Sequence, residues 1–175
     1  GMKNTHDIKI NTIIDHAIVV KDNIEKALCV VDMPKNTYRN KKEAIKNAKF
    51  IIKKSKCDAV KIECNGNNYE IIKNLVLNKI PVMGHIGFTP QFFNKFRIQG
   101  TSKKEQNKLI SQAINIEKAG AFSIVLECMN SKLAQKITNT LKIPTIGIGS
   151  SAQCDGQILV TDDMLGLSGF YPRFV

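Results

Sequence analysis

The sequence predicts one α/β domain over residues 1–175, built on a parallel sheet of about six strands and forming an incomplete (β/α)8 barrel of the TIM type. Two observations lead to this prediction. Short apolar runs alternate with amphipathic stretches along the whole chain, which is typical of parallel strands joined by helices. The chain has 175 residues, whereas a complete barrel of this type needs about 250. An open, doubly wound sheet is the alternative, but no Gly-x-Gly-x-x-Gly motif follows the first strand to support a dinucleotide-binding version.

The amphipathic stretches predict helices whose starts carry capping residues. Thr12 and Asp15 resemble a capping box at the start of the first helix. At the start of the second helix, Glu43 lies three residues after Asn40, which indicates a cap. Ser102 is expected to cap the longest helix, and Gly120 to end it. The expected helices cover residues 12–21, 40–54, 69–77, 102–119 and 131–141.

Charged or polar residues follow the apolar runs that we interpret as strands. These runs cover residues 27–31, 59–62, 81–84, 123–126, 145–148 and 158–160. The residues at their ends are Asp32, Lys61 with Glu63, His85, Glu127, and Gly147 with Gly149. The strands of a parallel barrel open their carboxyl ends onto one face, where active sites lie. Each such residue alone is more often structural, but charged groups at four successive strand ends favour a functional site.

The residue types at these positions indicate metal-assisted acid–base chemistry. Asp32 and Glu63 offer the hard oxygen ligands that Mg²⁺ prefers, and bound Mg²⁺ acts as a Lewis acid towards a 2-oxo acid. Lys61 is suited to bind substrate oxygens. Glu127, enclosed by apolar strands, is the expected general base. His85 is expected to bind a substrate oxygen or to transfer a proton.

Several motifs resemble one enzyme family. In chain order they are DMPKNTY, VKIE, IPVMGHIGFTPQ, IQGTS, EKAGAFSIVLEC, IPTIGIG and CDGQILV. Together they resemble ketopantoate hydroxymethyltransferase, a (β/α)8 barrel of the phosphoenolpyruvate mutase and isocitrate lyase group that assembles into homo-oligomers. The resemblance implies transfer of a hydroxymethyl group from methylenetetrahydrofolate to 3-methyl-2-oxobutanoate, in pantothenate biosynthesis.

The resemblance also implies roles for individual residues. Asp32 would bind Mg²⁺ and substrate, Glu63 would bind the metal, and Lys61 would bind the oxo acid. His85 matches the histidine of the family's Gly-His-x-Gly motif and would contact substrate, while Glu127 would take the substrate proton. Relative to the family we expect a chain shortened at both ends. In particular, the family's second strand ends in an Asp-Ser pair that has no counterpart before Asp32.

Composition and charge limit the further functions and partners that we expect for this chain. The net charge is +11, but the lysines are scattered without interleaved aromatics, so we do not expect a nucleic-acid platform. We expect no membrane span, and the five cysteines favour a reducing compartment, the cytoplasm. Exposed edges of an open barrel favour a homo-oligomer. Two other functions stay open: a non-catalytic homologue or assembly subunit of the family, and another Mg²⁺-dependent 2-oxo acid enzyme of the same barrel group.

Overall fold

The computed structural model describes residues 6–93, 95–167, 169, 172 and 174. Within them, one parallel sheet runs in the order β1-β2-β3-β4-β5-β6. Its strands are β1 (Val30–Asp32), β2 (Ala59–Glu63), β3 (Val82–Gly87), β4 (Ser123–Glu127), β5 (Thr145–Ile148) and β6 (Gly156–Gln157). The helices are α1 (Ile10–Asp22), α2 (Lys41–Ser55), α3 (Tyr69–Leu77), α4 (Lys103–Lys118), α5 (Ser131–Thr140) and α6 (Thr161–Met164).

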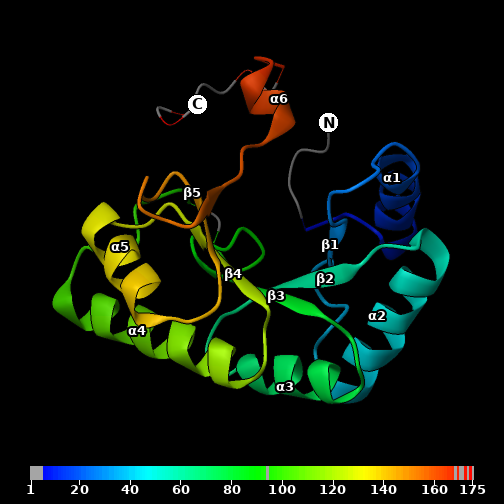
Figure 1. The fold of residues 1–175 in the computed structure, drawn as a ribbon, viewed down its shortest axis with the longest axis horizontal. Coiled ribbons are helices and arrows are strands. Elements are labelled where there is room, and N and C mark those ends of the chain that lie inside the picture. Colours follow the sequence, from blue (N-terminus) through cyan, green and yellow to red (C-terminus); the bar gives the residue numbers. More distant parts are fainter. Residues whose placement is uncertain (1–5, 94, 168, 170–171, 173, 175) are drawn as a thin grey trace.

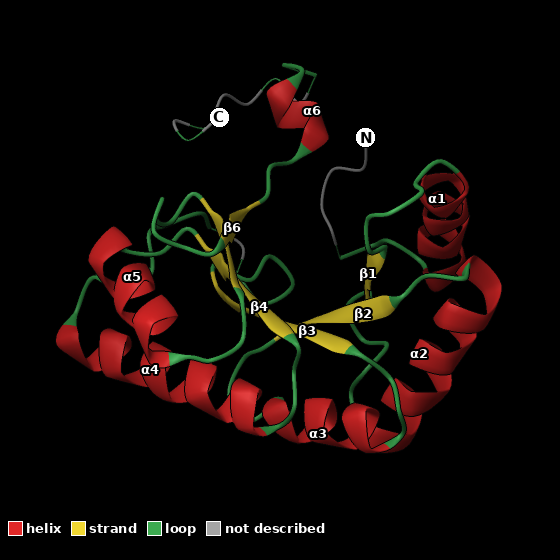
Figure 2. Cartoon of the chain, viewed as in Figure 1, coloured by secondary structure: helices red, strands yellow, loops and turns green. Residues whose placement is uncertain are grey.

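The sheet curls, and the long helices lie on its convex side. Figure 1 shows α2, α3, α4 and α5 arranged as an arc outside the strands, whereas α6 lies across the open side. Figure 2 shows the same arc by element type. A doubly wound sheet has helices on both faces and reverses its strand order. The strictly sequential order and the outer arc therefore confirm the incomplete barrel and exclude the open-sheet alternative.

The capping predictions hold for two helices and fail for one. Asn40 Oδ1 accepts a hydrogen bond from the Glu43 amide at the start of α2, and Ser102 Oγ accepts one from the Glu105 amide at the start of α4. The predicted capping box at the start of the first helix is wrong. That helix begins at Ile10, where the N-cap residue, Lys9, makes no side-chain capping bond.

Several strand boundaries also differ from the predictions. The first strand was predicted at residues 27–31, but β1 covers Val30–Asp32. β3 continues to Gly87, so His85 lies inside the strand and not beyond its end. The last strand was predicted at residues 158–160, but the sheet pairing is at Gly156–Gln157 and only the Ile158 amide continues it, donating to the Gly147 carbonyl. The apolar side chains of residues 158–160 are exposed. The prediction, which followed apolar composition, therefore put this strand too far towards the C-terminus. The short helix α6 was not predicted.

The core lies between the convex face of the sheet and the helices. Its fully buried strand residues, such as Val60, Ile62, Ile86 and Leu126, pack against helix residues that include Ile51 and Ile116. Burying such side chains contributes about 1.5–3 kcal/mol each. This layer holds the strands in place, so the residues on the concave face are presented on a rigid support.

The concave face opens into a cavity of about 650 Å³. Its rims are apolar and belong to the two ends of the sheet. Val19, Val20 and Leu28 are exposed beside β1, and residues 158–160 are exposed beside β6. The outer edges of β1 and β6 pair with no further strand among the described residues. Over the same residues, no helix is long and apolar enough to cross a membrane.

Candidate active site

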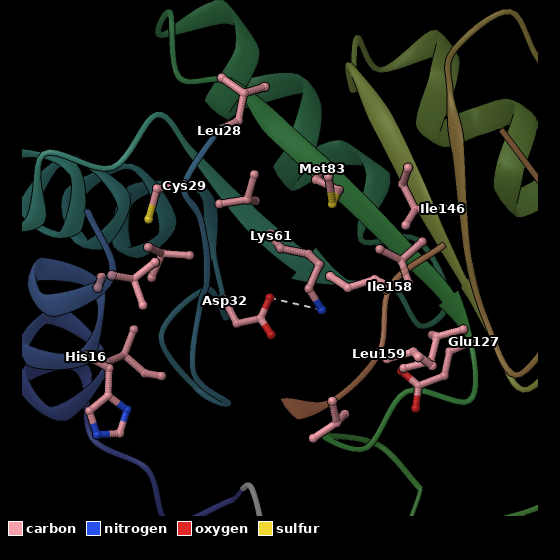
Figure 3. A pocket seen from close by; sticks show the side chains of 18 of the residues that line it. His16, Leu28, Cys29, Asp32, Lys61, Met83, Glu127, Ile146, Ile158 and Leu159 are labelled. Atoms are coloured by element: carbon pink, nitrogen blue, oxygen red, sulfur yellow. Dashed lines mark ion pairs between the residues drawn. The ribbon is translucent and has the colours of Figure 1, made fainter. Parts of the chain in front are cut away.

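The strand registers bring the predicted residues to one end of the sheet. Asp32 pairs with Lys61, Glu63 pairs with His85, and Gly87 pairs with Glu127. Alternate residues of a strand point to the same face, so Lys61 and Glu63 share the concave side. Figure 3 shows Asp32, Lys61 and Glu127 around the same cavity. The predicted convergence of the strand-end residues is thus found in the fold.

Four of the five charged or ionisable residues form a continuous chain of contacts. Lys61 Nζ lies 2.9 Å from Asp32 Oδ1 and 3.4 Å from His85 Nδ1. His85 Nε2 lies 3.1 Å from Glu127 Oε2. That last contact is not a hydrogen bond, and Nε2 is a buried nitrogen without a hydrogen-bond partner among the described residues. A buried donor left unpaired is costly, so this nitrogen marks a place where a ligand atom would be stabilised.

Lys61 is the cation of the site. Burial alone would lower its pKa. The hydrogen bond and negative charge of Asp32, together with the charges of Glu63 and Glu127, outweigh burial and raise the pKa above the ordinary value. The Lys61 side chain is 18% exposed and that of Asp32 is 52% exposed. The ammonium therefore stays charged at the cavity wall, where it can attract a carboxylate or an oxo group.

His85 is a neutral imidazole in this setting. Its side chain is 1% exposed, and burial together with the nearby Lys61 charge holds its pKa well below the ordinary value. Because the Lys61 ammonium can only donate, its contact with Nδ1 favours the tautomer that carries the proton on Nε2. His85 is thereby prepared to donate a hydrogen bond towards Glu127 or towards a bound ligand.

Glu127 has the properties of a general base. Burial raises its pKa to about 7, with Lys61 opposing the shift and Asp32 adding to it. Its carbonyl accepts a hydrogen bond from the Phe88 amide, and this close approach requires glycine at position 87, where a Cβ would clash with that carbonyl. The next residue, Cys128, has a φ of +47°, an uncommon conformation for a side chain other than glycine. The strand is thus turned sharply just after the carboxylate.

Glu63 lies beside this chain of contacts and has separate partners. Burial raises its pKa to about 7. Its Oε2 accepts a hydrogen bond of 2.8 Å from the Gln91 amide. The side chain of Gln91 in turn accepts a bond from Tyr38 and donates one to the Met33 carbonyl. Sequence reasoning missed Tyr38 and Gln91 because they are uncharged, although both lie within motifs that carry the family resemblance.

The donors suit a partly hydrated divalent cation. Asp32 and Glu63 bring two carboxylates within electrostatic range, since Asp32 contributes to the raised pKa of Glu63. Only Oδ1 of Asp32 is engaged by Lys61 among the described residues. No group of three or more histidine, cysteine, aspartate or glutamate side chains in that part of the chain is arranged to hold a metal. Mg²⁺ is commonly held by one or two carboxylates, with waters and substrate as further ligands, so this pair fits it.

Comparison with known proteins gives a consistent family assignment. The family model described as ketopantoate hydroxymethyltransferase matches residues 1–175. The 3-methyl-2-oxobutanoate hydroxymethyltransferase of Pelagibacter ubique is 51% identical over 175 residues, covering 100% of this chain and 68% of that protein. The enzyme of the same name from Clostridioides difficile is 47% identical over 180 residues, covering 100% of this chain and 66% of that protein. An Anaplasma marginale relative of that name is 45% identical over 178 residues, with 64% of its length matched and 100% of this chain. The chain thus spans about two thirds of the length of these curated relatives.

Solved structures support the fold. An N-(5'-phosphoribosyl)anthranilate isomerase from Pyrococcus furiosus aligns with a TM-score of 0.51 at 14% identity, covering 83% of this chain and 63% of that protein. A type I 3-dehydroquinate dehydratase from Clostridium difficile aligns with a TM-score of 0.50 at 15% identity, covering 82% and 58%. At these identities the similarity concerns the barrel architecture and not the chemistry.

Proposed function

This chain belongs to the ketopantoate hydroxymethyltransferase family, and we propose that it transfers a hydroxymethyl group to 3-methyl-2-oxobutanoate. The one-carbon donor would be methylenetetrahydrofolate. The single observation that carries the proposal is the contact chain Asp32–Lys61–His85–Glu127. In it a cation and a carboxylate of raised pKa line one cavity, and a buried neutral imidazole lies between them.

The first step needs a base that removes the proton from C3 of the oxo acid. A carboxylate whose pKa is near neutrality combines a sizeable ionised fraction with a strong affinity for the proton. Glu127, with its pKa raised to about 7, meets that requirement. The carbon freed of its proton would then form a bond to the methylene carbon of the donor as one C–N bond of that carbon breaks. Water would replace the second nitrogen and supply the hydroxyl oxygen. The two nitrogens would take up the proton removed from C3 and one proton of the water, and tetrahydrofolate would leave.

The negative charge that develops on the oxo acid needs stabilising groups. The positive charge of the Lys61 ammonium acts on the base, and this ammonium would pair with the substrate carboxylate or oxo oxygen. His85 Nε2 lies 3.1 Å from Glu127 Oε2, and its proton would bond to a substrate oxygen that approaches beside that carboxylate. Both groups are held by strands and not by loops, so neither needs to reorganise during the reaction.

We propose Asp32 and Glu63 as the residues that hold Mg²⁺. The metal would supply Lewis-acid stabilisation of the charge on the oxo acid. Asp32 would keep Oδ1 on Lys61 and offer its other oxygen to the metal. Glu63 would offer the oxygen that Gln91 does not occupy. These roles rest on the donor chemistry and on the implied match with the family.

The cavity wall favours an oxo acid with a branched aliphatic chain. Met83, Val125, Ile146 and Ile148 line the cavity together with Glu127. An isopropyl group lying on these side chains would gain about 0.8 kcal/mol for each buried carbon group. Its C3 proton would then face the carboxylate and not the solvent.

We also propose a homo-oligomer in the cytoplasm. The apolar rims beside β1 and β6, which include Val20, Leu28 and Leu159, support association because exposed sheet edges and apolar patches favour pairing with another chain. The five cysteines, all free and buried, agree with a reducing compartment.

A direct test supplies the purified protein with 3-methyl-2-oxobutanoate, methylenetetrahydrofolate and Mg²⁺, and follows ketopantoate by mass spectrometry. Product that requires all three and is absent with Glu127→Gln supports the proposal. Turnover of another 2-oxo acid without the folate donor would favour a different reaction of the same barrel group. A folded protein that forms no product with any of these substrates would favour a non-catalytic homologue.

A further inference from the structure

Gln91 connects the ends of two strands that carry the proposed metal ligands. It lies in the segment between β3 and α4 and is 6% exposed. Its backbone amide donates to Glu63 Oε2 at 2.8 Å, and its side-chain Nε2 donates to the Met33 carbonyl at 2.9 Å. Met33 directly follows Asp32. One residue therefore bonds to the Glu63 carboxylate and to the carbonyl of the residue that follows Asp32.

Tyr38 fixes the orientation of that amide. Its side chain is buried, and its hydroxyl donates to Gln91 Oε1 at 2.6 Å and lies 3.5 Å from the Glu63 carbonyl. With Oε1 accepting from Tyr38, the NH₂ group of Gln91 must face the Met33 carbonyl. The amide is thus held in a single orientation by two different partners.

We propose that Tyr38 and Gln91 are positioning residues that set the separation between Asp32 and Glu63, and so tune the binding of the metal and the oxo acid. This inference rests on the metal role proposed above for these two carboxylates. Neither residue needs to touch the metal. They act through Met33 and Glu63, because their bonds tie the ends of β1 and β2 to the segment that follows β3.

Two physical reasons give these bonds a functional consequence. β1 is paired on one side only and is three residues long. Just after it, the Met33 amide donates to the Lys61 carbonyl, and the Gln91 bond to the Met33 carbonyl adds a second restraint on the same residue. Mg²⁺ also demands near-ideal geometry, so a small change in the separation of two carboxylates weakens its binding. Partners of metal ligands typically change metal affinity by about 10–100-fold when they are removed.

The test measures Mn²⁺ binding to the full chain by electron paramagnetic resonance, using Tyr38→Phe and Gln91→Met. Tyr38→Phe removes one hydroxyl, which keeps the experiment informative even where Gln91→Met fails to fold. Gln99→Met is the matched control. Gln99 is also buried in the β3–α4 segment, but its side-chain amide bonds to the Arg97 carbonyl and not to a carboxylate-bearing strand. Its backbone amide donates to the Cys128 carbonyl, and the substitution keeps that bond. The KM for the oxo acid and the kcat for C3 proton exchange are measured for the same proteins.

We expect Tyr38→Phe and Gln91→Met to weaken Mn²⁺ binding by about 10-fold or more, with a raised KM and a smaller change in kcat. Gln99→Met should bind Mn²⁺ as the unsubstituted protein does. Unchanged Mn²⁺ binding in a folded Tyr38→Phe or Gln91→Met protein overturns the positioning role but leaves the metal role of Asp32 and Glu63 standing. An equal loss of Mn²⁺ affinity in Gln99→Met has the same consequence. An unsubstituted protein that binds no Mn²⁺ overturns the metal role of Asp32 and Glu63, and the positioning role with it.

Discussion

His85 Nε2 lies 3.1 Å from Glu127 Oε2, which places a neutral, buried imidazole against a half-buried carboxylate at the wall of the cavity. The strand register produces this pair, because His85 is level with Val125 and Glu127 is the next residue of β4 on the same face. The imidazole lies against the carboxylate without adding a positive charge. His85 therefore does not oppose the raised pKa that burial gives Glu127.

The pH dependence of proton exchange follows from that raised pKa. A base works only in its ionised form, so the rate of C3 exchange of the oxo acid should rise with pH and level off above about 7. Exchange rates measured by NMR between pH 5 and 9 check this. A rate that is already at its plateau at pH 5 would show that the base is not a buried carboxylate of raised pKa.

The stability of the metal-free protein should depend on pH in the opposite sense. Burial raises the pKa of Glu63 and of Glu127 from 4.5 to about 7, so the folded state holds both protons more tightly than the unfolded state. Their contribution to stability is fully present below about pH 4.5 and is lost as the pH rises through about 7. Denaturant unfolding should therefore give a lower free energy of unfolding at pH 8 than at pH 5. This difference should shrink in Glu63→Gln and Glu127→Gln, and an unchanged difference in both variants would assign it to other groups.

Replacing Lys61 should affect substrate binding. Lys61→Met removes the cation and leaves Asp32 without its ion-pair partner. A hydrogen bond to a charged group contributes about 1.5–3 kcal/mol, which corresponds to roughly 10–100-fold weaker binding of 3-methyl-2-oxobutanoate. Ligand titration by NMR measures the affinity. Lys73→Met, on an exposed position of α3, is the control and should bind as the unsubstituted protein does.

The exposed apolar rims should govern self-association. We expect the protein to sediment as an oligomer, and the double variant Val20→Asn, Leu28→Asn to shift towards smaller species, because these exposed side chains lie beside the unpaired edge of β1. Leu77→Asn is the matched control, since Leu77 is equally apolar and exposed but lies on α3, away from both edges. Sedimentation velocity distinguishes the outcomes. A monomer at all concentrations, or the same shift with Leu77→Asn, would contradict a role for this rim.

The sequence predicted the barrel and the convergence of its charged residues well, because both follow from local patterns. Alternating apolar and amphipathic runs determine the element order, and the parallel topology then brings Asp32, Lys61 and Glu127 to one face. Asn40 and Ser102 were recognised as caps because a glutamate three residues later completes the signal.

Other features depend on tertiary contacts that no local pattern reveals. The apolar run at residues 158–160 has the composition of a strand, but the sheet pairs at Gly156 and Gln157. Tyr38 and Gln91 are uncharged, and their importance comes from a hydrogen bond between residues far apart in the sequence. Likewise, the contact between His85 and Lys61 depends on the register of two strands, which a single sequence does not specify.

The most direct measurement is the exchange of the C3 proton of 3-methyl-2-oxobutanoate into heavy water, followed by NMR with and without Mg²⁺. It requires only the oxo acid, the metal and the base. We predict Mg²⁺-dependent exchange that falls by about 10²–10⁴-fold in Glu127→Gln and is unchanged in Glu70→Gln, an exposed glutamate of α3. Exchange that persists in folded Glu127→Gln, or a folded unsubstituted protein without any exchange, would contradict the role of Glu127 as the base.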